Sequence, residues 1–388
     1  MTRTDSVRGH IALMVGHCAG MVDLVALPVW VGTLIAHYRF DPQQAGLLAT
    51  LFLAGAVLAS LALAPRFNRL NGRLVATLGF GGAAAGFGLA STSAEFVMLA
   101  ALHVMSGVAA GAALSVTHGT IARSARPHRL FALVGIALGV FAIVFLGATP
   151  PLVAALGGPV LFQVFAGVMA VAALVSALAF PVADRPAAAQ ASRSPGAPSG
   201  RIPRAVWFGI VGIGCMGLVQ AMTFSFLERV GSDRGFGLAA VTGVLIALGI
   251  VNLFPAALAA WLEKRWPART VMMTGPVVQA LLVAVIMNSP AFAPYAMAAS
   301  VFAAVMIFTH TFAFGLLARL DLSGRAMAAT PAMLMIGAAI GPILGGTLVK
   351  ALGYGSLGAA ALAIGAVAVF CFSRIPSSRA ATRPEVLA

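Results

Sequence analysis

The sequence predicts an all-α membrane protein with twelve transmembrane helices in two pseudo-symmetric six-helix bundles. Of its 388 residues, 61% are hydrophobic and only 9% are charged, a composition that excludes a water-soluble globular domain. Apolar stretches of about 20 residues, the length that spans the hydrocarbon core, recur along the whole chain. Since a helix satisfies its backbone hydrogen bonds within one segment, these stretches are expected to be helices and not barrel strands.

Turn signals and charge clusters separate the apolar stretches. The start of the second span is well marked, because Asp41 is a good N-cap residue and Pro42 suits the first helical position; Ser323 and Gly324 mark the start of the eleventh span. The first span is too long for a signal peptide, so we expect it to be retained. The predicted spans are 10–38, 43–64, 73–92, 95–122, 130–156, 159–181, 205–230, 237–262, 269–288, 291–318, 326–350 and 355–373.

A segment without apolar periodicity divides the twelve spans into two sets of six. Residues 182–204 are rich in Pro, Ala, Ser and Arg, a composition typical of a flexible linker. The sequence therefore predicts an N-terminal bundle over 1–181, a cytoplasmic linker over 182–204 and a C-terminal bundle over 205–388.

The two halves share a short internal repeat. CAGMVD, Cys18 to Asp23, in the first span corresponds to CMGLVQ, Cys215 to Gln220, in the seventh, at an offset of 197 residues. The same offset carries the basic loop 66–73 onto the charged loop 263–270. Two coincident registers favour a duplication of one six-helix unit.

The distribution of Lys and Arg predicts the orientation in the membrane. Of the 24 Lys and Arg residues, 20 fall in the tails and in the loops on the side of the termini, and none lies deep in a span. By the positive-inside bias both termini are cytoplasmic, in a bacterial-type inner membrane. The net charge of +14 is thereby explained by topology, and nucleic-acid binding, which needs a clustered basic patch, is not expected.

Asp23 is the one acidic residue predicted deep inside a span. A charged carboxylate near the bilayer midplane costs about 2.5 to 3.5 kcal/mol on insertion scales, so an intramembrane acid is a candidate functional site. Gly16, Gly20, Asp23, Leu27 and Trp30 recur at helical spacing and share one face. We expect Asp23 to act as a proton site and, with Trp30, to line a central cavity; a structural role as a protonated acid is the alternative.

Other polar residues in the spans are weaker candidates. Gln220, the repeat partner of Asp23, cannot titrate and either binds substrate or bonds a neighbouring helix. His103 is a candidate for proton coupling, since imidazole titrates near neutral pH, and Asn252 and His310 are candidates for substrate contact. The alternative for each is a structural role, in which the side chain forms hydrogen bonds within the packed helices.

Several chemistries lack support in the sequence. Cys18, Cys215 and Cys371 have no paired spacing, so neither a disulfide framework nor a metal site is predicted. GFGGAAAG, residues 79–86, lies inside a predicted span, where it indicates helix packing and not a dinucleotide loop. Without a P-loop or clustered catalytic residues, an enzyme, an ATP-driven pump and any cofactor are not expected.

The twelve spans, the linker after the sixth and the acid in the first span resemble the major facilitator superfamily over the whole chain. The family's loop motif between spans 2 and 3, G-x-x-x-D-R-x-G-R-[RK], corresponds here to APRFNRLNGR, with Asn68 at the acid position and with Arg69 and Arg73 retained. The resemblance implies a conformational role for this loop, although Asn68 cannot form the family's ion pair. The family's R-x-x-x-G in span 4 is replaced by His103 and Gly107.

A third motif is closer to the family pattern. GAAIGPILGG, Gly337 to Gly346, fits G-x-x-x-G-P-x-x-G-G, which the family carries in span 5 of proton-exchanging exporters; here it falls in span 11. Glycines allow close helix approach, and a proline removes a backbone donor. We expect a conformational role for its residues, which are Gly337, Gly341, Pro342, Gly345 and Gly346.

The sequence thus predicts a monomeric secondary transporter, surrounded by membrane lipid, for a small, neutral or cationic, partly apolar compound. Proton-coupled efflux by alternating access is the favoured mode, and import of a small metabolite by proton symport or facilitated diffusion is the alternative. A membrane enzyme, a pore and a structural subunit are the rival classes; a pore would need neither the duplicated halves nor the linker. In a transporter, Asp23 and Gln220 should face one central cavity.

Overall fold

The computed structural model describes residues 3–182, 203–263, 265–320 and 325–376. These ranges form helices and contain no strand, and twelve segments are long and apolar enough to cross a membrane. The elements are α1 (Val7–Gly20), α2 (Val22–Tyr38), α3 (Pro42–Leu63), η1 (Ala64–Arg69), α4 (Gly72–Ala90), α5 (Phe96–Ala122), α6 (Pro127–Leu156), α7 (Pro159–Ala179), α8 (Arg204–Asp233), α9 (Leu238–Val251), α10 (Pro255–Leu262), α11 (Ala268–Asn288), α12 (Phe292–Leu320), α13 (Arg325–Leu352) and α14 (Gly355–Ser373).

The twelve spans agree with the prediction, and two of them are interrupted. The first is divided at Met21 into α1 and α2, and the eighth is divided at 252–254 into α9 and α10. The predicted cap at Asp41 is present, since its Oδ1 accepts a hydrogen bond from the Gln44 N–H at 2.9 Å. The cap predicted at residues 323 and 324 lies outside the described residues.

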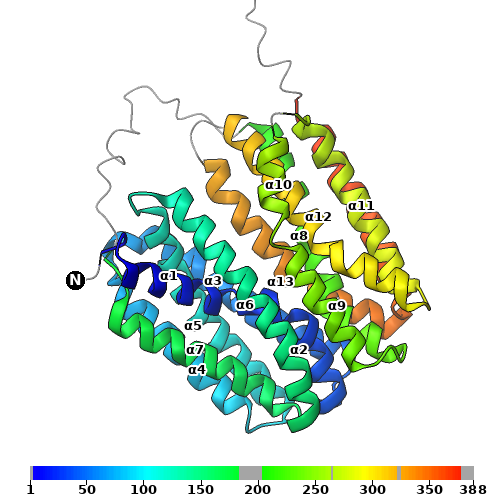
Figure 1. The fold of residues 1–388 in the computed structure, drawn as a ribbon, viewed down its shortest axis with the longest axis horizontal. Coiled ribbons are helices and arrows are strands. Elements are labelled where there is room, and N and C mark those ends of the chain that lie inside the picture. The colour runs from blue at the N-terminus through cyan, green and yellow to red at the C-terminus, as the bar shows by residue number, and fades with distance from the viewer. Residues whose placement is uncertain (1–2, 183–202, 264, 321–324, 377–388) are drawn as a thin grey trace, which may run out of the picture.

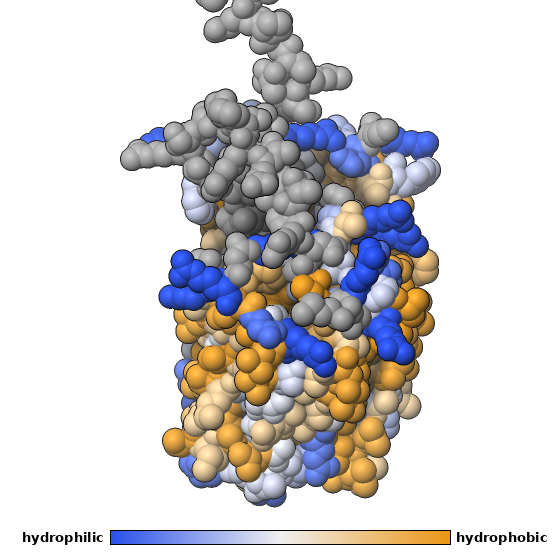
Figure 2. Space-filling view, turned by 90° about the vertical axis from the view of Figure 1, so that its left-hand side faces the viewer, coloured by the Kyte–Doolittle hydropathy of each residue, from blue (hydrophilic) through white to orange (hydrophobic). Residues whose placement is uncertain are grey.

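The helices form two groups that lie side by side (Figure 1). The first group contains α1 to α7, coloured blue to green, and the second contains α8 to α14, coloured green to red. Most of the predicted linker, 183–202, lies outside the described residues. On the face shown in Figure 2, hydrophilic side chains gather toward the grey segments, and apolar side chains cover much of the remainder. Such a distribution suits a chain that crosses a bilayer.

In the described part of the chain, the main contacts between the two bundles come from three helix pairs: α2 packs on α8, α3 on α13 and α6 on α9. Gly46 near the start of α3 lies against the Pro342 carbonyl, and the Pro42 carbonyl lies against Gly346 near the end of α13. Because α3 begins, and α13 ends, at the membrane face opposite the termini, the bundles are closed together at that end.

Inside the N-terminal bundle, aromatic side chains fill the centre. Trp30 packs edge-on against Phe52, Phe87 and Phe165, with ring centroids 4.9 to 6.1 Å apart. Such pairs add to the stabilisation that burial of large side chains already gives. This cluster fixes the rotation of α2 about its axis.

Candidate functional site

Asp23 lies at the interruption of the first span. Its side chain is 3% exposed, and its Oδ1 accepts a hydrogen bond from the Leu24 N–H at 2.8 Å, within the first turn of α2. The span runs from Val7 to Tyr38, so Asp23 is at its middle. Among the described residues no ion pair involves Asp23. The structure thus places a carboxyl group without a cation partner near the centre of the membrane.

The predicted face of the first span exists, but it turns into its own bundle. Gly16 contacts Thr117 of α5, and Gly20 contacts Leu114 of the same helix. Trp30 has no exposed surface and belongs to the aromatic cluster. The expectation that Trp30 lines a central cavity is therefore wrong for this conformation, because the aromatic side chains of α3, α4 and α7 cover it.

His103 lies beside this cluster. Its ring centroid is 5.4 Å from that of Trp30, and its Nδ1 is 2.6 Å from the Leu99 carbonyl oxygen. A carbonyl accepts, so Nδ1 carries the proton and Nε2 has a free lone pair. Nε2 is buried and has no hydrogen-bond partner among the described residues. His103 is therefore a half-satisfied buried imidazole, close to the interior of the bundle and separate from the bundle interface.

The candidates in the second bundle form hydrogen bonds only to residues of that bundle in the described structure. The Gln279 Nε2 of α11 donates to the Gln220 Oε1 and to the Met216 carbonyl, each at 3.2 Å, so Gln220 bonds a neighbouring helix. Asn252 lies in the interruption of the eighth span, with its Oδ1 buried and unpaired within the described part of the chain. The His310 Nδ1 is 3.0 Å from the carbonyl of Met306 in its own helix. The shared cavity of Asp23 and Gln220 remains a prediction.

The first three glycines of GAAIGPILGG pack α13 onto α8. Gly337 lies against the Gly214 carbonyl, and a Cβ at Gly341 would be 2.6 Å from the Met222 N. A Cβ at Gly345 would be 3.0 Å from the Phe226 ring. Because backbone atoms form the first two of these contacts, a larger side chain could not be accommodated by a rotamer change.

The end of the same motif packs across to the other bundle. We call this interface the glycine seam; on α3 it consists of Pro42, Gly46 and Thr50, and on α13 of Pro342, Ile343 and Gly346. The Ile343 N–H donates to the Thr50 Oγ1 at 3.1 Å. At its rim, the Lys350 Nζ lies 2.9 Å from the Asp41 Oδ2. The motif therefore contributes both to packing within one bundle and to the contact between bundles.

The loop motif between the second and third spans lies in η1 and at the start of α4. The side chain of Asn68 is outside the described residues. Arg69 is exposed, and the Arg73 guanidinium donates to the Ala177 carbonyl of α7. Arg73 thus ties α4 to α7 within the N-terminal bundle, and its conformational role remains a prediction.

Two polar arrangements were not predicted from the sequence. The Glu228 carboxylate of α8 fills the space beside Gly32 of α2, at the contact between the bundles, and its Oε1 accepts from the Ser232 hydroxyl at 2.6 Å. The His17 Nδ1 and the His118 Nε2 are 2.9 Å apart, joining α1 to α5. Glu228 and His118 lie near the ends of predicted spans, where polar residues are common. Only their contacts with a neighbouring helix, which the sequence does not show, set them apart from other such residues.

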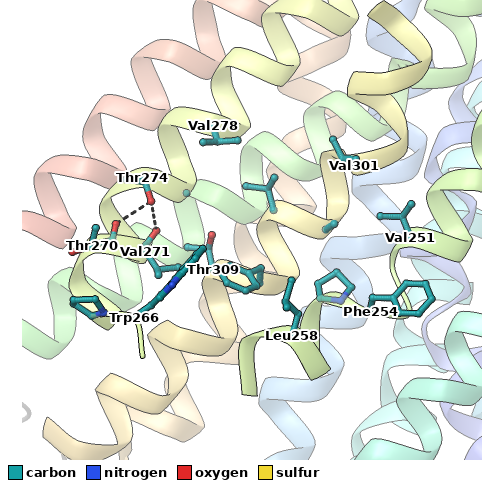
Figure 3. A pocket seen from close by; sticks show the side chains of 16 residues that line it. Val251, Phe254, Leu258, Trp266, Thr270, Val271, Thr274, Val278, Val301 and Thr309 are labelled. Carbon is teal, nitrogen blue, oxygen red and sulfur yellow. Dashed lines mark hydrogen bonds between the residues drawn. The ribbon is translucent and has the colours of Figure 1, made fainter. Parts of the chain in front are cut away.

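An apolar pocket of about 780 Å³ lies between α9, α10, α11 and α12 (Figure 3). Its lining includes Phe254, Trp266 and Phe308, and no charged residue among those that the structure describes. None of the site residues predicted from the sequence lines it. The volume falls in the range of small-molecule sites, which are mostly apolar with few polar groups.

The comparisons agree with the fold. The model of the Major Facilitator Superfamily matches residues 12–320. The chain resembles the structure of a bacterial homologue of the human lysosomal transporter Spinster in an inward-facing and occupied conformation, with 15% identity, a TM-score of 0.69, and coverage of 94% of this chain and 93% of that one. It also resembles the nucleoside transporter NupG, with 16% identity, a TM-score of 0.70, and coverage of 95% and 98%. None of the curated protein sequences matches the chain.

Proposed function

Because this chain belongs to the major facilitator superfamily, we propose that it exports a small, neutral or cationic, partly apolar compound across the inner membrane in exchange for protons. The observation that carries the proposal is Asp23, buried at the interrupted middle of the first span without a cation partner in the described structure. The positive-inside bias supports cytoplasmic termini. With that orientation, the closed end of the bundles is the outer end.

The coupling follows from the cost of an unpaired charge. An ionised Asp23 in this buried position would cost about 2.5 to 3.5 kcal/mol, so ionisation favours a conformation in which water reaches the carboxylate. Protonation removes that cost and favours the buried position. If water reaches Asp23 from opposite sides in the two conformations, proton binding and release bias the rocking of the bundles.

The substrate class follows from the charges. No described Lys or Arg lies deep within a span, so a strongly anionic compound would find no charge partner there. The polar groups proposed for substrate contact are Gln220, Asn252 and His310, which can hydrogen-bond a neutral compound. Binding by these residues requires the other conformation or a rearrangement, because Gln220 is bonded to Gln279 in this one.

The test is transport of a compound panel into proteoliposomes with an imposed pH gradient. We expect gradient-driven accumulation by the wild type and a loss of at least tenfold in Asp23→Asn, while substrate exchange without a gradient is retained. Asp5→Asn, which removes an exposed acid of the N-terminal segment, is the matched control and should behave as wild type.

Three outcomes contradict the proposal in different ways. Accumulation that is unchanged in Asp23→Asn removes Asp23 from the mechanism. Accumulation that requires protons and compound to move in the same direction identifies an importer by symport, and indifference to the gradient identifies facilitated diffusion.

A further inference from the structure

The pocket in Figure 3 is lined by Thr309, whose hydroxyl makes no hydrogen bond to a described residue. Thr309 of α12 is 1% exposed and lines the pocket. Its Oγ1 lies against Gly275 of α11, where only a residue without a side chain leaves room for it. No hydrogen bond to a described residue engages this hydroxyl, whereas the Thr274 hydroxyl donates to the carbonyls of Thr270 and Val271. A free hydroxyl in an apolar pocket is an unused hydrogen-bonding site.

The described lining of the pocket comes entirely from the second bundle, and its outer side chains are exposed on or beside membrane-spanning helices. Its outer residues are large and exposed: Phe254 is 63% exposed, Trp266 is 51% exposed, and Leu258, Val278 and Val301 are each at least 40% exposed. All five side chains belong to the membrane-spanning part of the second bundle or its rim. A molecule dissolved in the membrane can therefore reach the pocket without passing through water.

The composition of the lining limits the ligand. The described lining contains no charged residue, so it favours a neutral ligand over an ion, which would lose its hydration there without gaining a partner. Phe254, Trp266 and Phe308 provide aromatic surface for an apolar or aromatic body. Thr309 provides one hydrogen bond.

A phospholipid chain fits this chemistry less well. Thr309 is three residues from the middle of α12 (Phe292–Leu320), or roughly 5 Å along the axis at 1.5 Å per residue. The ester groups of a lipid lie at the edge of a hydrocarbon core about 30 Å thick. An acyl chain at the depth of Thr309 therefore has no polar atom to offer and would leave the hydroxyl unpaired.

We propose that the pocket between α9, α10, α11 and α12 is a membrane-facing binding site for a small, neutral, mostly apolar molecule with one hydrogen-bonding group, held by Thr309. The inference rests on the proposed function in one respect only, which is the chemical class of the compound that binds. Equilibrium binding at the pocket needs neither transport nor Asp23, so either proposal can fail while the other stands.

The experiment is photolabelling of the full chain in lipid nanodiscs. The probe is a benzyl alcohol that carries a trifluoromethyl diazirine; the control probe has iodine in place of the hydroxymethyl group and so has no hydrogen-bonding group. We expect the alcohol to label peptides containing residues 267–278 and 301–309 saturably. We expect the iodo compound to label all lipid-facing helices without saturation.

Two variants define the site. Thr309→Val keeps the shape and removes the hydroxyl, and should weaken saturable labelling by the alcohol about tenfold, the value of one hydrogen bond. Thr311→Val is the matched control, because the Thr311 hydroxyl donates to the Ile307 carbonyl of its own helix at 2.7 Å. Val301→Trp, at an exposed rim position, should block labelling of the pocket even if Thr309→Val does not fold.

Three results would overturn the proposal. The first is labelling by the alcohol that never saturates, and the second is equal labelling of wild type and Thr309→Val. The third is saturable labelling by both probes, which would identify a site for lipid chains or other wholly apolar molecules. If the wild type shows saturable labelling but no pH-driven transport, the proposed function is contradicted and the proposal for the pocket is not.

Discussion

Two interfaces between the bundles are equivalent under the internal repeat, yet they are built from different contacts. The offset of 197 residues carries α3 onto α9 and α6 onto α13. The glycine seam between α3 and α13 brings backbone against backbone. The interface between α6 and α9, which we call the aliphatic seam, is formed by Gly139, Ile143 and Gly147 facing Leu253, Gly249 and Ile246.

The difference concerns how each seam can separate. In the aliphatic seam a glycine faces the branched end of a side chain, and a Cβ at Gly147 would be 3.3 Å from the Ile246 side chain. Such contacts can slide and refill by rotamer changes. The glycine seam adds a hydrogen bond from Ile343 to Thr50 and an ion pair from Lys350 to Asp41. The glycine seam is therefore the better candidate for an interface with two discrete states, and the aliphatic seam for a pivot.

The largest effect is expected from Gly46→Leu. A side chain at Gly46 would meet the Pro342 carbonyl, a backbone atom that cannot move aside, so the glycine seam cannot close. We expect the distance between spin labels at Ala94 and Ala291, in loops at the closed end, to lengthen and transport to fall at least tenfold.

The internal repeat supplies the control for this variant. Gly243 on α9 is the repeat partner of Gly46, and a Cβ there meets nothing within 4 Å. Gly243→Leu should therefore leave the label distance and transport near wild type. An equal loss in both variants would mean that the two seams do not differ in the way described.

An intermediate effect is expected from Thr50→Val. The variant keeps the shape of the side chain and removes the acceptor of the Ile343 N–H, at a cost of about 1 to 2 kcal/mol to the closed form. The same label pair should report a 5- to 30-fold shift of the population toward the open form. Ser300→Ala removes a hydroxyl that bonds only within α12 and should cause no shift; a Thr50→Val distance profile identical to wild type would show that this bond is not specific to the closed form.

The smallest effect concerns the ion pair at the rim. Desolvation opposes ionisation of Asp41, but hydrogen bonds from the Gln44 N–H and from Lys350 outweigh it and lower the pKa of Asp41 below its usual value. The stabilisation of the closed form is then fully present above about pH 4, the ordinary value for Asp, and is lost as the pH falls through the lowered pKa.

Both partners are partly exposed, so the pair contributes at most about 1 kcal/mol. Between pH 7 and pH 5 the label distances should be constant, and a modest opening should appear only below about pH 4. Asp41→Asn should remove that step. Opening between pH 7 and pH 5 that persists in Asp41→Asn would assign the pH response to another group.

The extent of correct prediction differs between the spans and the site. Span boundaries were predicted within a few residues, because the length of each apolar stretch can be read directly from the sequence. The shared face of Gly20 and Trp30 was also correct as a periodicity. The expectation that this face lines a central cavity was wrong for Trp30, because the pattern of one helix does not say which neighbouring helix covers it.

Long-range partners were the part that could not be predicted. Gln220 was left open between a substrate and a neighbouring helix, and Gln279 from α11 is the partner in this conformation. The free hydroxyl of Thr309 gave no signal in the sequence, since most Thr hydroxyls in helices bond to their own backbone, as that of Thr311 does. Its significance depends on Gly275, which is on another helix.

The sequence by itself determined the number of spans, the helical class and the residues able to carry charge or hydrogen bonds in the membrane, because these follow from the thickness and polarity of the bilayer. Only the tertiary structure decided that GAAIGPILGG serves both α8 and the opposite bundle, that Trp30 is enclosed and that a pocket opens beside Thr309. Those features depend on the rotation and pairing of helices far apart in the chain, which packing sets and local pattern does not.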